Sequence, residues 1–333
     1  MNSSSEPLLA IDGLTVEFPS TTGALTAVDA VTLHVARGET VGLVGESGSG
    51  KSMTALAVVG LVPQPGRVAA GEVRFDGARV TGMSERELRR IRGAGIGFVF
   101  QEPMTALNPV FTIGDQIVET LAVHGVARGK AAWARAAELL DAVRLPDPER
   151  RLRDYPHQLS GGQRQRALIA MALSCNPKVL VADEPTTALD VTVQAEILDL
   201  LREMKERLGL ALLLITHDLG VVAETADRVA VMYAGRIVEQ SPVAELFADP
   251  LHPYTRGLLK SMPGQEQGRH LHAIPGMVPP LGNLPPGCTF APRCPDRFDP
   301  CDQARPGDAV IGTRRVKCYL HDSPMLAPKG GRA

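Results

Sequence analysis

The chain has 333 residues, of which 44% are hydrophobic and 22% charged, and its formal net charge is -2. This composition excludes a disordered chain and binding of nucleic acid through bulk charge, and the length allows one large domain with an appendage or two modest domains. No apolar run approaches the roughly 20 residues of a membrane-spanning helix, and the first residues lack the pattern of a secretory signal. We therefore expect the protein to stay in the cytoplasm.

The first hundred residues are expected to be rich in strands. Apolar runs bounded by turn residues predict strands over 8–18, 27–35, 40–44, 72–75 and 96–100. Apolar residues at helical spacing then predict helices over 113–124 and 131–145. The middle of the chain is thus expected to form an inserted helical block.

Strands and helices alternate in the next part of the chain. A helix is expected from about 162, followed by a strand over 179–182, a helix over 191–208 and strands over 211–215 and 229–232. Such alternation is typical of an α/β fold with a mostly parallel sheet covered on both faces. Ligands then bind at the carboxyl ends of the strands.

Residues 45–52 read GESGSGKS and satisfy the pattern G-x-x-x-x-G-K-S between an apolar strand and a helix running through residues 56–61. In such a loop, glycines let backbone N–H groups face a phosphate, the lysine bridges the outer phosphates and the last hydroxyl can bind Mg²⁺. The alternative, a chance Gly/Ser loop, fits this strand-loop-helix context poorly. The candidate nucleotide-binding residues are Gly45, Ser47, Gly48, Ser49, Gly50, Lys51 and Ser52.

The strand expected over 179–182 leads directly into two carboxylates, Asp183 and Glu184. An aspartate here can hold the Mg²⁺ shell, and the following glutamate can act as general base or position a water for attack on the terminal phosphate. The alternative is an exposed acidic turn before Pro185. Beside a phosphate loop, the hydrolytic interpretation is favoured.

A second anion-binding helix start is predicted at Ser160, Gly161, Gly162 and Gln163, where a helix follows a Gly-Gly pair. One nucleotide needs only one such set of N–H groups, and this set follows the first by more than a hundred residues. The second set is therefore expected to cap phosphates held by another subunit. A flexible Gly-Gly helix start is the structural alternative.

This ordered set resembles the ABC ATPase family, whose signature sequence is identical to residues 159–163. The resemblance covers roughly residues 8–262. It implies that Gln101 contacts Mg²⁺ and couples to membrane subunits, that Asp190 in the segment 187–190 communicates across a dimer, and that His217 contacts the terminal phosphate. Phe18 lies where the family stacks an aromatic ring on adenine. Taken singly, these four could be a strand-end polar residue, a helix cap, a surface histidine and a core aromatic residue.

Residues 100–109, 155–158 and 252–255 look like the ATPases of dipeptide and oligopeptide importers. That resemblance implies an ATP-hydrolysing subunit that powers peptide import, with nickel or another small solute as the alternative cargo. The implied partners are a second ATPase or an identical copy, two membrane permease subunits and an extracytoplasmic peptide-binding protein, without nucleic acid. The implied location is peripheral, at the cytoplasmic face of the inner membrane. A soluble ABC ATPase acting on nucleic acid or ribosomes is a further alternative.

Four of the five cysteines, Cys288, Cys294, Cys301 and Cys318, lie near the end of the chain in a proline-rich segment. Four thiolates can complete a zinc site or hold an iron–sulfur cluster, and their spacing does not choose between these groups. The resemblance to peptide-importer ATPases implies a [4Fe-4S] cluster, with Zn²⁺ as the alternative and free or disulfide-bonded thiols also open.

The predicted organisation is a P-loop NTPase of ABC type. A nucleotide-binding domain over 8–262 comprises an N-terminal antiparallel β lobe, a parallel-sheet core and a helical lobe at about 103–175. A small Pro/Cys-rich extension follows over 263–333.

Overall fold

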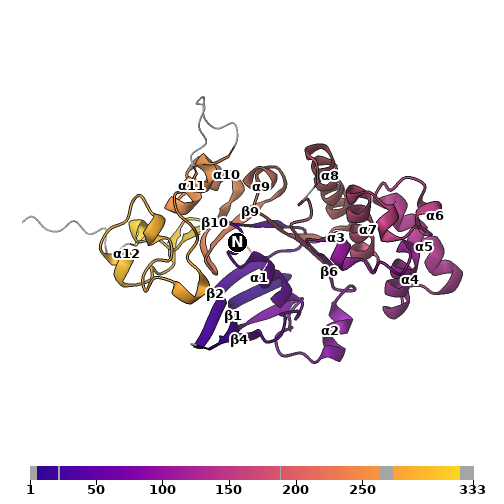
Figure 1. Ribbon diagram of the computed structural model, residues 1–333, viewed down its shortest axis with the longest axis horizontal. Coiled ribbons are helices and arrows are strands. Elements are labelled where there is room, and N and C mark those ends of the chain that lie inside the picture. The colour runs from indigo at the N-terminus through magenta and orange to yellow at the C-terminus, as the bar shows by residue number, and fades with distance from the viewer. Residues whose placement is uncertain (1–5, 22, 188, 263–272, 323–333) are drawn as a thin grey trace, which may run out of the picture.

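Two β-sheets form the centre of the molecule (Figure 1), which is a computed structural model describing residues 6–21, 23–187, 189–262 and 273–322. One sheet has four antiparallel strands in the order β2-β1-β4-β5, and the other has eight in the order β11-β12-β10-β9-β3-β8-β7-β6. The strands are β1 (Leu9–Ser20), β2 (Gly23–Val35), β3 (Thr40–Val44), β4 (Arg67–Phe75), β5 (Ala78–Arg79), β6 (Ile96–Val99), β7 (Val179–Asp183), β8 (Ala211–Thr216), β9 (Arg228–Tyr233), β10 (Arg236–Pro242), β11 (Ala309–Ile311) and β12 (Arg314–Val316).

Helices cover the eight-stranded sheet and build a separate lobe. The α-helices are α1 (Lys51–Val58), α2 (Glu85–Ile91), α3 (Pro103–Ala106), α4 (Ile113–Val123), α5 (Gly129–Ala142), α6 (Pro148–Arg151), α7 (Gly161–Leu173), α8 (Val191–Leu208), α9 (Leu219–Thr225), α10 (Val243–Ala248), α11 (Pro253–Lys260) and α12 (Pro300–Gln303). The 3₁₀-helices among the described residues are η1 (Pro156–Gln158), η2 (Leu281–Asn283), η3 (Ala291–Arg293) and η4 (Tyr319–His321).

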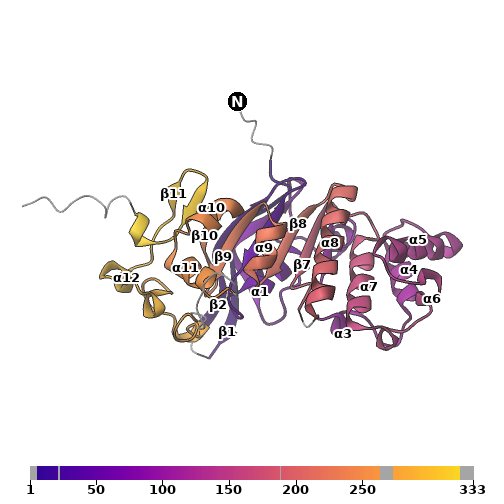
Figure 2. The same ribbon diagram turned by 90° about the horizontal axis from the view of Figure 1, so that it is seen from above.

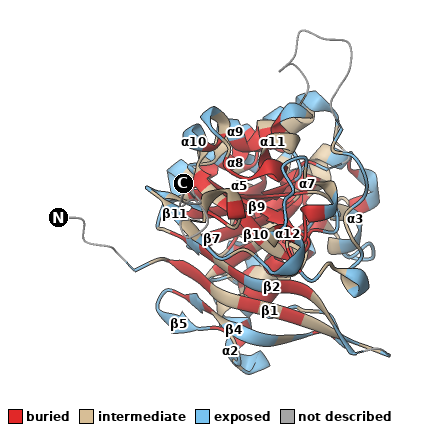
Figure 3. Cartoon of the chain, turned by 90° about the vertical axis from the view of Figure 1, so that its left-hand side faces the viewer, coloured by how far each residue is buried: buried red, intermediate tan, exposed pale blue. Residues whose placement is uncertain are grey.

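The central strands are buried on both faces, as the apolar runs predicted. In β8, Leu212 and Leu214 pack with the helical lobe, whereas Leu213 and Ile215 pack with α1 and the four-stranded sheet. This alternation follows from the two-residue period of a strand. Figure 3 shows the buried residues concentrated in the strands.

The molecule is elongated, with two appendages at opposite ends of the sheet (Figure 2). Helices α4 to α7 form one end, and the extension that carries α12 forms the other. Tight helix starts help to shape the helical end: the Thr112 hydroxyl accepts the N–H of Asp115 at 3.1 Å, and the Asp115 carboxylate accepts the Thr112 N–H in return.

Three details of the fold differ from the prediction. The large sheet is mixed, because β10, β12 and β11 add to it in antiparallel fashion. Two of these strands come from the Pro/Cys-rich extension, for which the sequence predicted no strand. Strand β12 pairs with β10 at Glu239 and Val316. Helix α1 ends at Val58 before the predicted limit, since the backbone turns at Gly60 with a φ of 65°.

Candidate active site

The predicted chemical groups gather at one edge of the large sheet. Strands β3, β8, β7 and β6 are neighbours and run parallel, so their carboxyl ends face the same way. The glycine-rich loop follows β3, His217 follows β8, Glu184 follows β7 and Gln101 follows β6. A site at the strand ends is what the α/β topology requires.

The glycines of the loop are needed for its close approach to β9. Gly50 has a φ of 104°, and a Cβ there would lie 2.7 Å from the Met232 methyl carbon and 2.8 Å from the Ala27 carbonyl oxygen. A Cβ on Gly45 would lie only 2.1 Å from the Met232 carbonyl oxygen. These positions therefore exclude side chains, and the loop keeps its backbone N–H groups available at the start of α1.

Lys51 is buried beneath the loop. Its ammonium group donates to the carbonyl oxygens of Gly45 at 2.9 Å and Glu46 at 3.2 Å, and it lies 3.8 Å from a carboxylate oxygen of Glu184. Burial lowers the pKa of Lys51, while the charges of Glu184 and Asp183 oppose that change. The arrangement places a cation between the loop and the carboxylates.

Ser52 and Asp183 lie side by side. The Ser52 hydroxyl donates to Asp183 Oδ1 at 3.1 Å. Burial raises the pKa of Asp183, and the hydrogen bond from Ser52 partly offsets this. Two adjacent oxygen groups of this kind suit a hard cation such as Mg²⁺.

The carboxylate of Glu184 is contacted by side chains from several parts of the site. Its carboxylate accepts hydrogen bonds from Gln101 Nε2 at 3.1 Å and Thr187 Oγ1 at 2.9 Å, and His217 Nδ1 lies 3.4 Å away. Its φ of 46° falls in the left-handed region, which non-glycine residues rarely adopt. In this arrangement the amide of Gln101 points to Glu184 and not to the Ser52–Asp183 pair.

The second helix start lies apart from the loop. Ser160 caps α7: its hydroxyl accepts the Gln163 N–H at 3.3 Å, and Gln163 Oε1 accepts the Ser160 N–H at 3.0 Å. Gly161 and Gly162 open the helix, and a Cβ on Gly162 would lie 2.6 Å from Val193 of α8. Within the part of the chain that the structure describes, no hydrogen bond or ion pair joins this segment to residues 45–52.

Two other predicted site residues have local partners. Asp190 accepts the Val193 N–H at 3.0 Å and thereby caps α8. Phe18 lies half-buried on β1, with its ring against the backbone of Gly66. Ala188, within the predicted segment 187–190, lies outside the described residues.

Three residues that contact the site, Thr187, Tyr254 and Arg293, were given no role in it by the sequence. Thr187 could have been found from the sequence, because it is a hydroxyl residue only one turn after Glu184. Tyr254 and Arg293 contact Glu46 of the glycine-rich loop from 208 and 247 positions away, respectively. No local pattern reveals such long-range contacts.

The four clustered cysteines line one small cavity together with His252 and Phe290. Burial raises the pKa of Cys294 to about 12 and that of Cys318 to about 11. The described residues contain no group of three or more His, Cys, Asp or Glu side chains placed to hold a metal ion. The expected [4Fe-4S] cluster, or another metal bound by these cysteines, is not supported by this geometry, because a metal needs thiolates that converge on it.

Comparison with known proteins decides the family. Residues 28–187 match the model described as ABC transporter, and residues 238–301 match the model described as Oligopeptide/dipeptide transporter, C-terminal region. The oligopeptide transport ATP-binding protein AppD of Bacillus subtilis is 49% identical over 318 residues, covering 95% of this chain and 97% of AppD. The chain belongs to the ABC transporter ATPases.

Other members of the ABC family agree in sequence and in fold. The dipeptide transport ATP-binding protein DppD of Haemophilus influenzae is 47% identical over 313 residues, covering 94% of this chain and 95% of DppD. The dimeric ATP-binding cassette MJ0796, solved in a post-hydrolysis state with ADP and Pi, superposes with a TM-score of 0.63 and 32% identity, covering 71% of this chain and 98% of that one. The protein is thus an ATP-hydrolysing transport motor of the ABC cassette fold, as the motifs predicted. Within the described residues, no helix is both long and apolar enough to cross a bilayer.

Proposed function

We propose that this ABC ATPase powers the import of dipeptides or oligopeptides. The match of residues 238–301 to the oligopeptide/dipeptide transporter C-terminal region carries the proposal, and the names of AppD and DppD agree with it. Nickel or another small solute is the alternative cargo for the same motor. Uptake by the assembled transporter should be measured with its binding protein and a panel of peptides and metal ions. ATP-dependent uptake of metal without peptide would reject the peptide assignment.

In the proposed site, the loop over 45–52 binds the phosphates and Lys51 bridges the outer ones. Ser52, Asp183 and Gln101 would hold Mg²⁺, which neutralises phosphate charge when bound. The adjacency of Ser52 and Asp183 at 3.1 Å supports this, although Gln101 must turn away from Glu184 to join them. His217 would contact the terminal phosphate, and Phe18 would stack on adenine.

Glu184 is proposed to accept a proton from, or to orient, the attacking water. Glu184→Gln is expected to leave MgATP affinity within about twofold while lowering turnover by at least about 100-fold, because the neutral amide cannot act as a base. Equilibrium binding and steady-state phosphate release measure the two effects. Unchanged turnover would remove Glu184 from this role. Glu206→Gln, on the exposed face of α8, is the matched control.

The proposed working state is a dimer of ATPase subunits in which Ser160 to Gln163 of each chain cap the nucleotide of the other. Asp190 would communicate between the two sites. The two ATPases, this chain and a paralogue or an identical copy, would bind two permease subunits at the cytoplasmic face of the membrane. An extracytoplasmic peptide-binding protein would deliver the peptide to the permease from the other side. The exposed side chains of Met104, Val110 and Phe111, at 51%, 71% and 50% exposure, support a docking surface for a permease beside Gln101.

Affinity purification from detergent-solubilised membranes tests these partners. We expect permease subunits and a second ATPase to be retained. Retention of ribosomes or nucleic acid in their place would favour the soluble ABC ATPase. The proposed domain division is a nucleotide-binding domain over 8–262, with its helical lobe at about 103–175, and an extension over 263–333, of which 263–272 and 323–333 lie outside the described residues.

We further propose that Cys288, Cys294, Cys301 and Cys318 bind a [4Fe-4S] cluster, with Zn²⁺ as the alternative. The four cysteines line one cavity, and binding would require their thiols to lose their protons and to move closer together. Such a group would crosslink a segment with little core of its own. Iron, sulfide and zinc analysis of protein purified without oxygen distinguishes the groups: stoichiometric zinc without iron rejects the cluster, and neither metal rejects both.

A further inference from the structure

Arg293, in the extension, is joined directly to the phosphate loop. Its Nη1 donates to Glu46 Oε2 at 2.7 Å and its Nη2 donates to Glu46 Oε1 at 3.0 Å, which is the two-pronged geometry of a strong Arg–carboxylate pair. Glu46 is the second residue of the loop over 45–52. The Arg293 side chain is only 6% exposed, so solvent screens this pair weakly.

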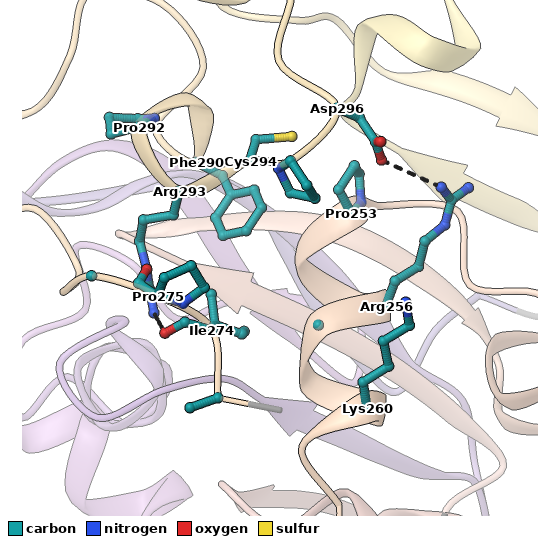
Figure 4. Close-up of a pocket in the computed structure, with 14 residues that line it drawn as sticks. Pro253, Arg256, Lys260, Ile274, Pro275, Phe290, Pro292, Arg293, Cys294 and Asp296 are labelled. Atoms are coloured by element: carbon teal, nitrogen blue, oxygen red, sulfur yellow. Dashed lines mark hydrogen bonds and ion pairs between the residues drawn. The ribbon is translucent and has the colours of Figure 1, made fainter. Parts of the chain in front are cut away.

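The rest of the guanidinium is also occupied. Arg293 Nε donates to the Pro275 carbonyl oxygen at 3.0 Å and Nη2 to that of Ile274 at 3.3 Å. The Tyr233 hydroxyl lies 3.4 Å from Nη1, and the guanidinium carbon lies 5.8 Å from the centre of the Tyr233 ring. A pocket lies between α11 and the extension, and Figure 4 shows Arg293 reaching toward Pro275 and Ile274 on one side of it. These contacts therefore fix the position of the guanidinium independently of Glu46.

A second contact holds the backbone of the same residue. The Glu46 N–H donates to the Tyr254 hydroxyl at 2.9 Å. Tyr254 is fully buried, and its ring lies 4.7 Å from that of Tyr233 and 5.3 Å from that of Phe290. The side chain and the backbone of Glu46 are thus both held by residues that follow the hydrolytic motifs in sequence.

Glu46 presents an electrostatic difficulty that this contact resolves. Its carboxylate lies in a loop that must surround the negative charges of a triphosphate, and like charges at short range disfavour binding. Arg293 supplies the compensating charge and draws the carboxylate toward the extension.

We propose that Arg293 is a positioning residue for nucleotide binding, which neutralises Glu46 and sets the phosphate loop in its binding conformation. The inference rests on the proposed nucleotide site and adds that the extension, besides any metal it holds, takes part in that site.

The test is MgATP binding by the full chain, with turnover measured in the assembled transporter. Arg293→Gln is expected to weaken MgATP binding and raise KM for ATP by about tenfold, with kcat within about twofold, because an unpaired Glu46 repels the phosphates. Adding Glu46→Gln to Arg293→Gln should restore the affinity to within about threefold of wild type, because it removes the uncompensated charge. A purely structural role of Arg293 would not give this rescue.

Arg256→Gln is the matched control. Arg256 of α11 pairs with Asp296 of the extension at 3.6 Å on the opposite side of the same pocket (Figure 4), and among the described residues no hydrogen bond or ion pair joins it to the loop. It should leave the affinity within about twofold. Arg293→Lys, which keeps the charge but loses the fork, should lose about threefold and serves as the second variant if Arg293→Gln lowers the melting temperature.

Unchanged affinity in Arg293→Gln, or a loss that Glu46→Gln does not reverse, would overturn the inference. Failure of the wild-type chain to bind MgATP would instead overturn the proposed nucleotide site. The two failures are thereby distinguished in one experiment.

Discussion

At the scale of single residues, the site is organised around the carboxylate of Glu184. Gln101 and Thr187 donate to it and His217 lies beside it, although these three residues come from separate parts of the chain. The neutral amide of Gln101 and the hydroxyl of Thr187 fix the orientation of this carboxylate and leave it able to accept a proton. Thr187 is the member of this group to which the sequence assigned no chemical role.

Thr187→Val tests whether that hydroxyl positions the proposed base. The substitution keeps the shape of the side chain but removes a hydrogen bond of 2.9 Å to Glu184. If this hydrogen bond lowers the activation free energy by about 1 kcal/mol, its loss should lower kcat about fivefold to tenfold and leave MgATP affinity within twofold. Steady-state kinetics measure both quantities. Thr120→Val, which removes a hydroxyl bonded within α4, is the control, and equal kcat in both variants would contradict the prediction.

The sequence predicted the positions of the chemical groups better than their partners. Lys51, Glu184 and His217 could be placed because each follows an apolar strand, and parallel strands end at one edge of a sheet. The bond between Arg293 and Glu46 could not be predicted, because it depends on how a proline-rich extension folds back over 247 positions. Local patterns contain no information about such distances.

At the scale of elements, the same contrast holds. Long periodic segments such as α8 and fully apolar ones such as β8 were predicted almost to the residue. Strands β10 and β12 were missed because they are short, polar or both, and the sheet itself stabilises them. Yet β10 carries Glu239, which is fully buried and accepts the N–H groups of Leu251 at 2.8 Å and His252 at 2.9 Å.

Glu239→Gln is therefore expected to destabilise the junction between β10 and α11. One acceptor oxygen becomes an amide donor that faces a backbone donor, at a cost of about 2 kcal/mol, or about 3 °C in melting temperature. Thermal and urea unfolding measure this change. Glu206→Gln, with the same chemistry on an exposed surface of α8, should shift the melting temperature by less than about 1 °C. A similar small shift for Glu239→Gln would show that its two hydrogen bonds contribute little.

At the scale of the whole molecule, the two anion-binding helix starts do not meet. The loop before α1 lies at the edge of the central sheet, whereas the start of α7 belongs to the helical end (Figure 2). In the proposed scheme, each chain therefore carries two half-sites for phosphate, at two different places. The dimeric structure of the cassette MJ0796 is a relative in which two such chains meet.

Ser160→Asp separates binding by one chain from turnover by the assembly. Aspartate is as good an N-cap as serine, so α7 should remain intact while a negative charge is placed at its start. MgATP affinity of the isolated chain should stay within about twofold, since its own loop does the binding, whereas turnover in the assembled transporter should fall about tenfold or more. Ser84→Asp makes the same change at the capping box of α2 and should leave both unchanged. Equal losses of affinity and turnover in Ser160→Asp would mean that α7 contacts its own chain's nucleotide, whereas loss of turnover alone is the result expected when a neighbour supplies the missing half of each site.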